Sequence, residues 1–142
     1  MQNSAYLLGQ LLKACDELHI FYCKVERDGD VPPQLVGNSM FAFASETPFR
    51  ALAQITLRMQ PYISWAKRYR TLTVMKNDVA NGLVGWNLSL LEDICTKLSQ
   101  ALQEPKRFTE YDKAQLFLGY LAAFPKRKKP ENEPDVNKTN NN

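Results

Sequence analysis

Apolar residues recur at every third or fourth position through most of this 142-residue chain, and no segment alternates apolar with polar residues as a half-buried β-strand does. Residues 5–24 illustrate the pattern, because apolar side chains occupy one helical face and Gln, Lys, Asp and Glu occupy the other. Ser4 is the expected N-cap of this helix. The spacing predicts an all-α fold, a single bundle of about five or six helices whose short connections favour antiparallel neighbours.

Prolines and glycines divide the first half of the chain. A loop is expected over 26–37, which holds two prolines and two glycines, and a short apolar helix over 39–45. Thr47 and Pro48 have the residue types of an N-cap and a first helical position. The helix that they open has Pro61 on its outer side and a predicted core face of Leu52, Ile55, Met59, Tyr62, Ile63 and Ala66.

Two helices are predicted in the next part of the chain. The first is short and covers 72–82, because Gly82 and Gly85 weaken the helical pattern. Ser89 and Glu92 then form a capping-box pattern, so a second helix is expected to begin there. A proline at residue 105 ends it.

The last helix is predicted from Thr109 and Asp112, a second capping-box pattern. After it comes a basic and Asn-rich segment, 126–142, that cannot form a core and is predicted to be disordered. The helical domain therefore covers 1–125. The apolar positions expected along the last helix are Ala114, Phe117, Leu118, Leu121 and Phe124.

The composition, with 44% hydrophobic and 23% charged residues, is that of a folded domain. No apolar run approaches the roughly 20 residues that cross a bilayer, and the first four residues lack the layout of a secretory signal. We therefore expect a cytoplasmic protein without membrane association.

Charge is distributed unevenly along the chain. The net charge is only +3, yet residues 47–77 contain six basic side chains and no acidic one. Exposed helical faces usually mix charges of both signs, so an acid-free stretch favours binding to a polyanion such as nucleic acid. Trp65 and Tyr69 in this stretch are candidates for stacking on bases. The predicted nucleic-acid-binding residues are Arg50, Arg58, Lys67, Arg68, Arg70 and Lys76.

The side chains that support catalysis or metal binding are scarce. The chain has three cysteines without a Cys-x-x-Cys spacing and a single histidine, His19, which sits at the edge of an apolar face and is expected to be a partly buried packing residue. Cys15 and Cys95 lie on apolar stripes and are expected to be inert. The inventory predicts a protein that is not an enzyme, with no catalytic residues, no metal and no cofactor.

Three segments in order carry a resemblance to a known family: Ala5–Leu12, Phe43–Pro48 and Gln115–Tyr120. Together they resemble the C-terminal helical region of the large subunit of type I (I-C-like) CRISPR Cascade effector complexes, a region also made as a separate small subunit. The match covers about residues 4–124. After Tyr120 the family often continues Tyr-His-Gln, whereas this chain has Leu121-Ala122-Ala123.

The resemblance implies a noncatalytic small subunit of an RNA-guided surveillance complex, present in more than one copy. Its implied partners are the CRISPR backbone and large subunits, the crRNA-containing complex and target DNA, chiefly the displaced non-target single strand of the R-loop. Because guide pairing reads the sequence, such a subunit needs only a sequence-independent basic surface. A start at Met1 just before the first motif fits a separately translated subunit, and a fragment of the large subunit would look the same.

Two other functions remain open from the sequence. The first is a helical adaptor or inhibitor that binds a protein partner and uses its basic helix only for solvation. The second is an enzyme whose active site is a composite one, with no motif for it in this sequence. Salt-dependent binding of single-stranded DNA distinguishes the nucleic-acid hypothesis from the adaptor.

Overall fold

The computed structural model describes residues 3–73 and 79–122. These residues form six helices and contain no strand, which confirms the predicted all-α bundle. Lys76 and residues 123–142, which include Phe124 and the predicted tail, lie outside the described residues. The helices are α1 (Ser4–Glu26), α2 (Val36–Ser39), α3 (Phe41–Glu46), α4 (Pro48–Thr73), α5 (Val79–Ala101) and α6 (Glu110–Leu121).

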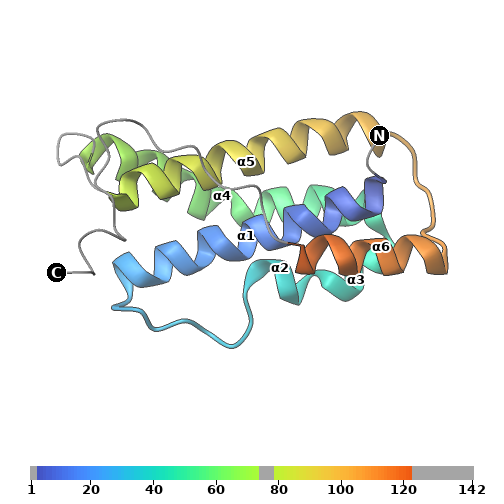
Figure 1. Ribbon diagram of the computed structural model, residues 1–142, viewed down its shortest axis with the longest axis horizontal. Helices are drawn as coiled ribbons and strands as arrows, with labels where there is room; N and C mark the ends of the chain where they lie inside the picture. Colours follow the sequence, from blue (N-terminus) through green and yellow to red (C-terminus); the bar gives the residue numbers. More distant parts are fainter. Residues whose placement is uncertain (1–2, 74–78, 123–142) are drawn as a thin grey trace, which may run out of the picture.

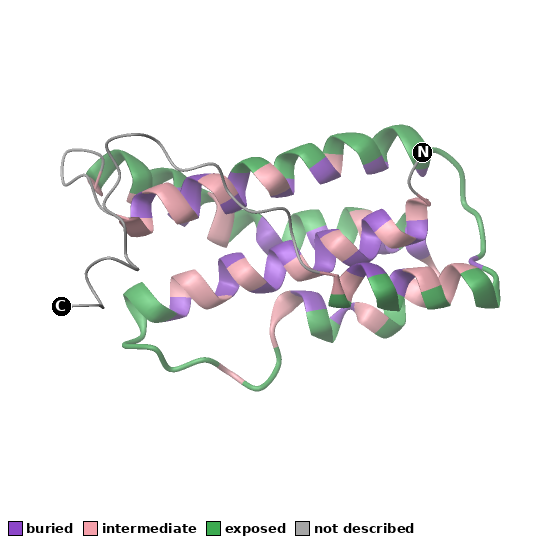
Figure 2. Cartoon of the chain, viewed as in Figure 1, coloured by how far each residue is buried: buried purple, intermediate pink, exposed green. Residues whose placement is uncertain are grey.

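Helix α1 is the centre of the bundle, since it contacts α2, α4, α5 and α6 (Figure 1). The long helices α4 and α5 lie along it, α6 lies along its first half, and the short α2 and α3 lead from its far end back to the start of α4. Figure 2 shows buried residues along most of α1 and exposed outer faces on α5 and α6. The largest fully buried side chains are Leu8, Leu11, Leu12, Leu18, Ile55, Met59, Leu98 and Leu116.

Two glycines allow the backbones of α1 and α6 to touch. A Cβ atom on Gly9 would collide with the backbone of Leu116, and one on Gly119 would collide with the backbone of Tyr6. Gly9 and Gly119 belong to two of the three segments that carry the family resemblance. In this fold those segments therefore set the α1–α6 crossing.

A buried carboxylate fixes α2 against α1. Asp16 accepts hydrogen bonds from the backbone N–H groups of Gly37 at 2.6 Å and Asn38 at 3.1 Å. One helical turn further along α1, the Nδ1 atom of His19 accepts a hydrogen bond from the N–H of Val36 at 3.3 Å. Its ring centroid lies 4.4 Å from that of Tyr62 on α4, so His19 is a packing residue, as predicted, and is buried. Burial lowers the pKa of His19 from its ordinary value.

The prediction of two helices between residues 72 and 105 was wrong. Helix α5 runs without interruption from Val79 to Ala101, and Ser89, the expected N-cap, is an exposed residue in its interior. Gly85 does not weaken the helix, because it faces Arg70 of α4 at a point where a Cβ atom would collide with the guanidinium. Packing of α5 on α4 and α1 therefore outweighs the low helix propensity of glycine.

Some helix ends also differ from the predictions. Asn3, not Ser4, caps α1, since its side-chain oxygen accepts the N–H of Ala5 at 2.7 Å. The short helix expected over 39–45 is α3 (Phe41–Glu46), and α2 (Val36–Ser39) begins within the segment 26–37 that was expected to be a loop. The capping box at the start of α6 is confirmed, because Thr109 accepts the N–H of Asp112 at 3.1 Å and Asp112 accepts that of Thr109 at 3.0 Å.

Candidate nucleic-acid interface

Helix α4 has an exposed basic side and no acidic residue. Its predicted core face is confirmed by buried Ile55, Met59 and Ala66, with Leu52, Tyr62 and Ile63 partly buried against the core, and Pro61 lies on the exposed side as expected. The exposed side carries four cations that form no ion pair within the described ranges 3–73 and 79–122; we call them the α4 cations. They are Arg50, Arg58, Lys67 and Arg68.

The α4 cations extend over most of the helix. Arg50 and Arg68 are 18 positions apart, which is five helical turns, so they share one side of α4 about 27 Å apart. Arg58 and Lys67 lie between them in the sequence. The distance between Arg50 and Arg68 matches several successive phosphates of a nucleic-acid strand.

Arg70 lies on a different side of α4 from Arg50 and Arg68. Its guanidinium packs over Gly85, and its backbone carbonyl accepts the side-chain amide of Asn81 at 2.8 Å. Arg70 therefore joins α4 to α5, although its side chain is partly open to solvent. Of the six predicted basic residues, five are exposed on α4, where Arg50 and Arg68 share one side and Arg70 packs beside α5, and Lys76 lies outside the described part of the chain.

Trp65, a candidate for stacking on bases, lies in the core with 5% of its surface exposed. Its Nε1 donates to Glu26 at 3.0 Å, and its ring stacks on Tyr69 with 5.2 Å between centroids. The Tyr22 ring packs edge-on against the Trp65 ring, with 5.5 Å between the two centroids. These contacts keep Trp65 and Tyr69 packed within the protein, and the geometry does not support their predicted role in base stacking.

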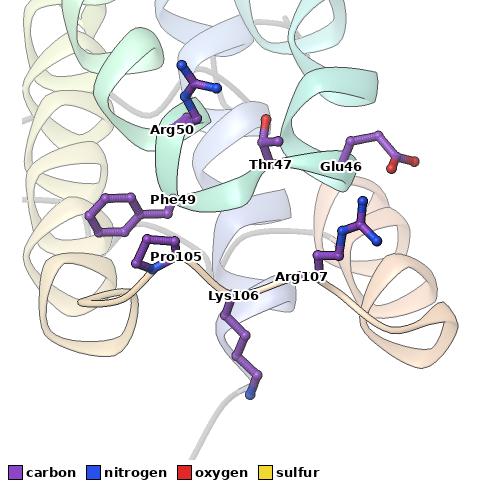
Figure 3. A pocket seen from close by; sticks show the side chains of 7 residues that line it. All are labelled: Glu46, Thr47, Phe49, Arg50, Pro105, Lys106 and Arg107. Carbon is purple, nitrogen blue, oxygen red and sulfur yellow. The ribbon is translucent and has the colours of Figure 1, made fainter.

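The structure brings two further cations to the first turn of α4. Lys106 and Arg107, which precede α6, line a cavity of about 240 Å³ together with Arg50 (Figure 3). The sequence did not single them out, because residues 78–125 contain more acidic than basic side chains. The one sequence feature that pointed to them was the pair of consecutive cations between Pro105, which was predicted to end a helix, and Thr109, the N-cap of α6. Phe49, Pro105, Thr47 and Glu46 complete the lining.

The electrostatics at this end of α4 favour an anion. The first turn of α4 has no acidic residue, and Thr47 donates its hydroxyl to the Phe43 carbonyl at 3.2 Å. Glu46 is the one carboxylate in the cavity lining, and it forms an ion pair with Lys113 at 3.2 Å. The hydrogen bond that Lys113 donates to Glu46 raises the pKa of Lys113. Lys113 on α6 therefore partly neutralises the negative charge of Glu46.

Helix α6 exposes apolar side chains on its outer side. Phe117, Leu118 and Leu121, apolar positions expected along this helix, all lie on its exposed side. Leu116 and Gly119 face α1 instead, because the close crossing of the two helices requires a residue without a side chain. The outer apolar face consists of Tyr111, Phe117, Leu118 and Leu121, which are 66%, 52%, 50% and 60% exposed.

The cysteines are distributed between core and surface. Cys15 and Cys23 are buried, Cys95 is half-buried, and burial raises the pKa of each thiol. Residues 3–73 and 79–122 contain no cluster of three or more His, Cys, Asp or Glu side chains arranged to hold a metal ion. Across the same ranges, every helix is too short or too polar to cross a membrane. Comparisons with protein-family models, curated proteins and solved structures find no match for this chain.

Proposed function

We propose that this protein is a noncatalytic subunit that binds single-stranded DNA through the phosphate backbone, using the α4 cations. The observation that carries the proposal is the exposure of Arg50, Arg58, Lys67 and Arg68 on a helix with no acidic residue. These side chains repel one another, and no ion pair within the described ranges compensates them. Neutralisation by phosphates removes that repulsion and releases counterions from the strand.

Binding through the α4 cations does not depend on base sequence. Phosphate contacts fix the position of a strand and carry no sequence information. The exposed Arg and Lys side chains along α4 span enough length to follow a strand, and they need no groove of a duplex. The surface therefore fits a task in which another component reads the sequence.

The resemblance noted above supplies such a task. In an RNA-guided CRISPR Cascade complex, guide pairing reads the target, and a small subunit with a basic surface keeps the displaced non-target strand from re-annealing. We place the protein in this class as a bridge between neighbouring backbone and large subunits, in more than one copy, in the cytoplasm. The residues that resemble the family pack α1 on α6, so support for DNA binding comes from α4 and not from those motifs.

A second candidate is the helical adaptor without nucleic-acid binding. The outer apolar face of α6 favours it, because four large exposed apolar side chains on 12 residues are typical of a protein contact. A subunit that bridges neighbours also needs such a contact. The two candidates therefore differ only in whether the α4 cations bind DNA.

The test is the salt dependence of binding of the full chain to a labelled 20-nucleotide single strand, measured by fluorescence anisotropy. The log–log slope should contain about −0.7 for each phosphate contact, or about −3 for the four α4 cations. The double variant Arg50→Ala/Arg68→Ala should reduce the slope by about 1.4 for every sequence tried.

The matched control is Lys24→Ala/Lys97→Ala, which removes the same charge from exposed positions on α1 and α5. It should bind with the wild-type slope. Equal slopes for both double variants would show that net charge alone drives binding, and absence of binding by the wild type would favour the adaptor.

A further inference from the structure

We propose that the cavity at the first turn of α4 receives one base of the bound single strand, which stacks on Phe49. This inference rests on the proposed DNA binding and adds to it the residue that contacts the bases. The sequence analysis assigned stacking to Trp65 and Tyr69, at the opposite end of the same helix.

Phe49 has the surroundings of a stacking residue. It is the second residue of α4, 37% of its surface is exposed, and no ring-to-ring contact involves it among the residues that the structure describes. Phe49 and Pro105 line the same cavity, and Figure 3 shows their rings beside one another as one apolar wall. At about 240 Å³ the cavity is smaller than a typical drug-sized site and suits a single planar ring system.

The cations around the cavity lie where the phosphates of a nucleotide run. In Figure 3 the side chains of Arg50 and Lys106 extend to opposite sides of the Phe49–Pro105 wall, and Arg107 extends toward Glu46. A base in a strand has one phosphate on each side of its sugar. Cations on both sides of an apolar wall therefore match a strand that passes over the cavity with one base turned inward.

The aromatic cavity at the other end of α4 is less suited to a base. It has a volume of about 280 Å³ and is lined by Trp65, Tyr69, Tyr22 and Arg68, with Glu26 and Leu72. Here the Trp65 and Tyr69 rings stack on each other, and the carboxylate of Glu26 holds the Trp65 N–H. A base would have to displace this packing, whereas no stacked pair of rings has to separate at Phe49. The one carboxylate in the Phe49 cavity, Glu46, is paired with Lys113.

The experiment compares two single strands of equal length and charge, a 20-nucleotide oligothymidylate and the same backbone with abasic sites. The full wild-type chain should bind the oligothymidylate about fivefold or more tightly, the effect expected of at least one stacked base. Phe49→Ala should bring the ratio close to one and leave the salt slope unchanged. Phe49→Trp should keep the preference, and Phe49→Leu should lose most of it while preserving apolar volume.

The control on the same helix is Leu57→Ala, which removes an exposed apolar side chain outside the cavity lining and should leave the ratio unchanged. The double variant Lys106→Ala/Arg107→Ala should lower the salt slope by about 1.4 and leave the base preference intact. Thermal unfolding followed by circular dichroism verifies that each variant is folded.

Each outcome separates this inference from the proposed function. Equal affinity of the wild type for both strands, or a preference that persists in Phe49→Ala, would overturn the stacking inference while DNA binding stands. Failure of the wild type to bind either strand would overturn both.

Discussion

Tyr120 on α6 donates its phenolic hydroxyl to the buried carboxylate of Asp16 on α1, with 2.5 Å between the two oxygens. The same carboxylate binds the N–H groups at the start of α2. One acidic side chain thus joins three helices that are distant in sequence. Burial, followed by the hydrogen bond to Asp16, raises the pKa of Tyr120.

Tyr120→Phe tests this junction. The variant keeps the ring and removes only the donor to a buried charge, so the free energy of unfolding should fall by about 1.5–3 kcal/mol in urea denaturation. Tyr111→Phe is the matched control, because Tyr111 is exposed on the same helix and should change stability by less than about 0.5 kcal/mol. Similar losses in both variants would show that the Asp16 bond does not stabilise the fold.

Gly119→Ala tests the contact of α6 with α1. In an isolated helix alanine is favoured over glycine by about 1 kcal/mol, yet here the added methyl group meets the backbone of Tyr6. We expect a net loss of about 1–3 kcal/mol of unfolding free energy, as in other overpacked sites, measured by chemical denaturation. A gain in stability would mean that the helices can separate without cost.

Substitutions on the long helices test which faces form the core. Leu98→Ala on α5 and Ile55→Ala on α4 remove fully or almost fully buried side chains and should each cost about 2–5 kcal/mol. Arg58→Ala, on the exposed side of α4, should stay within about 0.5 kcal/mol of the wild type. Equal costs at all three positions would contradict the assigned faces.

The pH dependence of stability should carry a contribution from His19. Because burial holds the pKa of His19 below its ordinary value of about 6.5, the unfolded chain binds more protons than the folded chain as the pH falls below that value. The contribution of His19 is therefore complete above about pH 6.5 and is lost as the pH falls through the lowered pKa. Protonation of Nδ1 also removes the acceptor for the Val36 N–H.

The measurement is the free energy of unfolding at pH 7.5 and at pH 5.5 for the wild type and for His19→Gln, which cannot titrate. The wild type should lose more stability than the variant between these pH values. An equal loss in the two proteins would assign the acid sensitivity to other groups.

Replacement of all four α4 cations tests the function in an assembled complex. In a complete guided complex the variant Arg50→Ala/Arg58→Ala/Lys67→Ala/Arg68→Ala should load the guide normally, because these side chains act on the displaced strand. Stable R-loop formation, measured by protection of the target duplex, should decrease and become more sensitive to salt. Wild-type R-loop formation across the salt range would leave the adaptor as the better candidate.

Local sequence determined the features that depend on neighbouring residues. The apolar stripe of α1, the core face of α4 around Ile55 and Met59, and the Thr109–Asp112 capping box all follow from spacings of three or four residues. The exposed side of α4 was also predictable, because an acid-free helix with one apolar face leaves its cations on the other. These patterns define the all-α class before any long-range contact forms.

Contacts between distant segments decided the rest. Ser89 and Glu92 have the same capping pattern as Thr109 and Asp112, yet they lie inside α5, because the packing of Gly85 under Arg70 continues the helix through that region. In α6 the close approach of Gly119 to α1 turns Phe117, Leu118 and Leu121 outward. Arg50 and Lys106 border one cavity although more than 50 positions separate them. Helical periodicity describes one helix at a time, whereas the face that is buried and the cations that gather depend on where two helices cross.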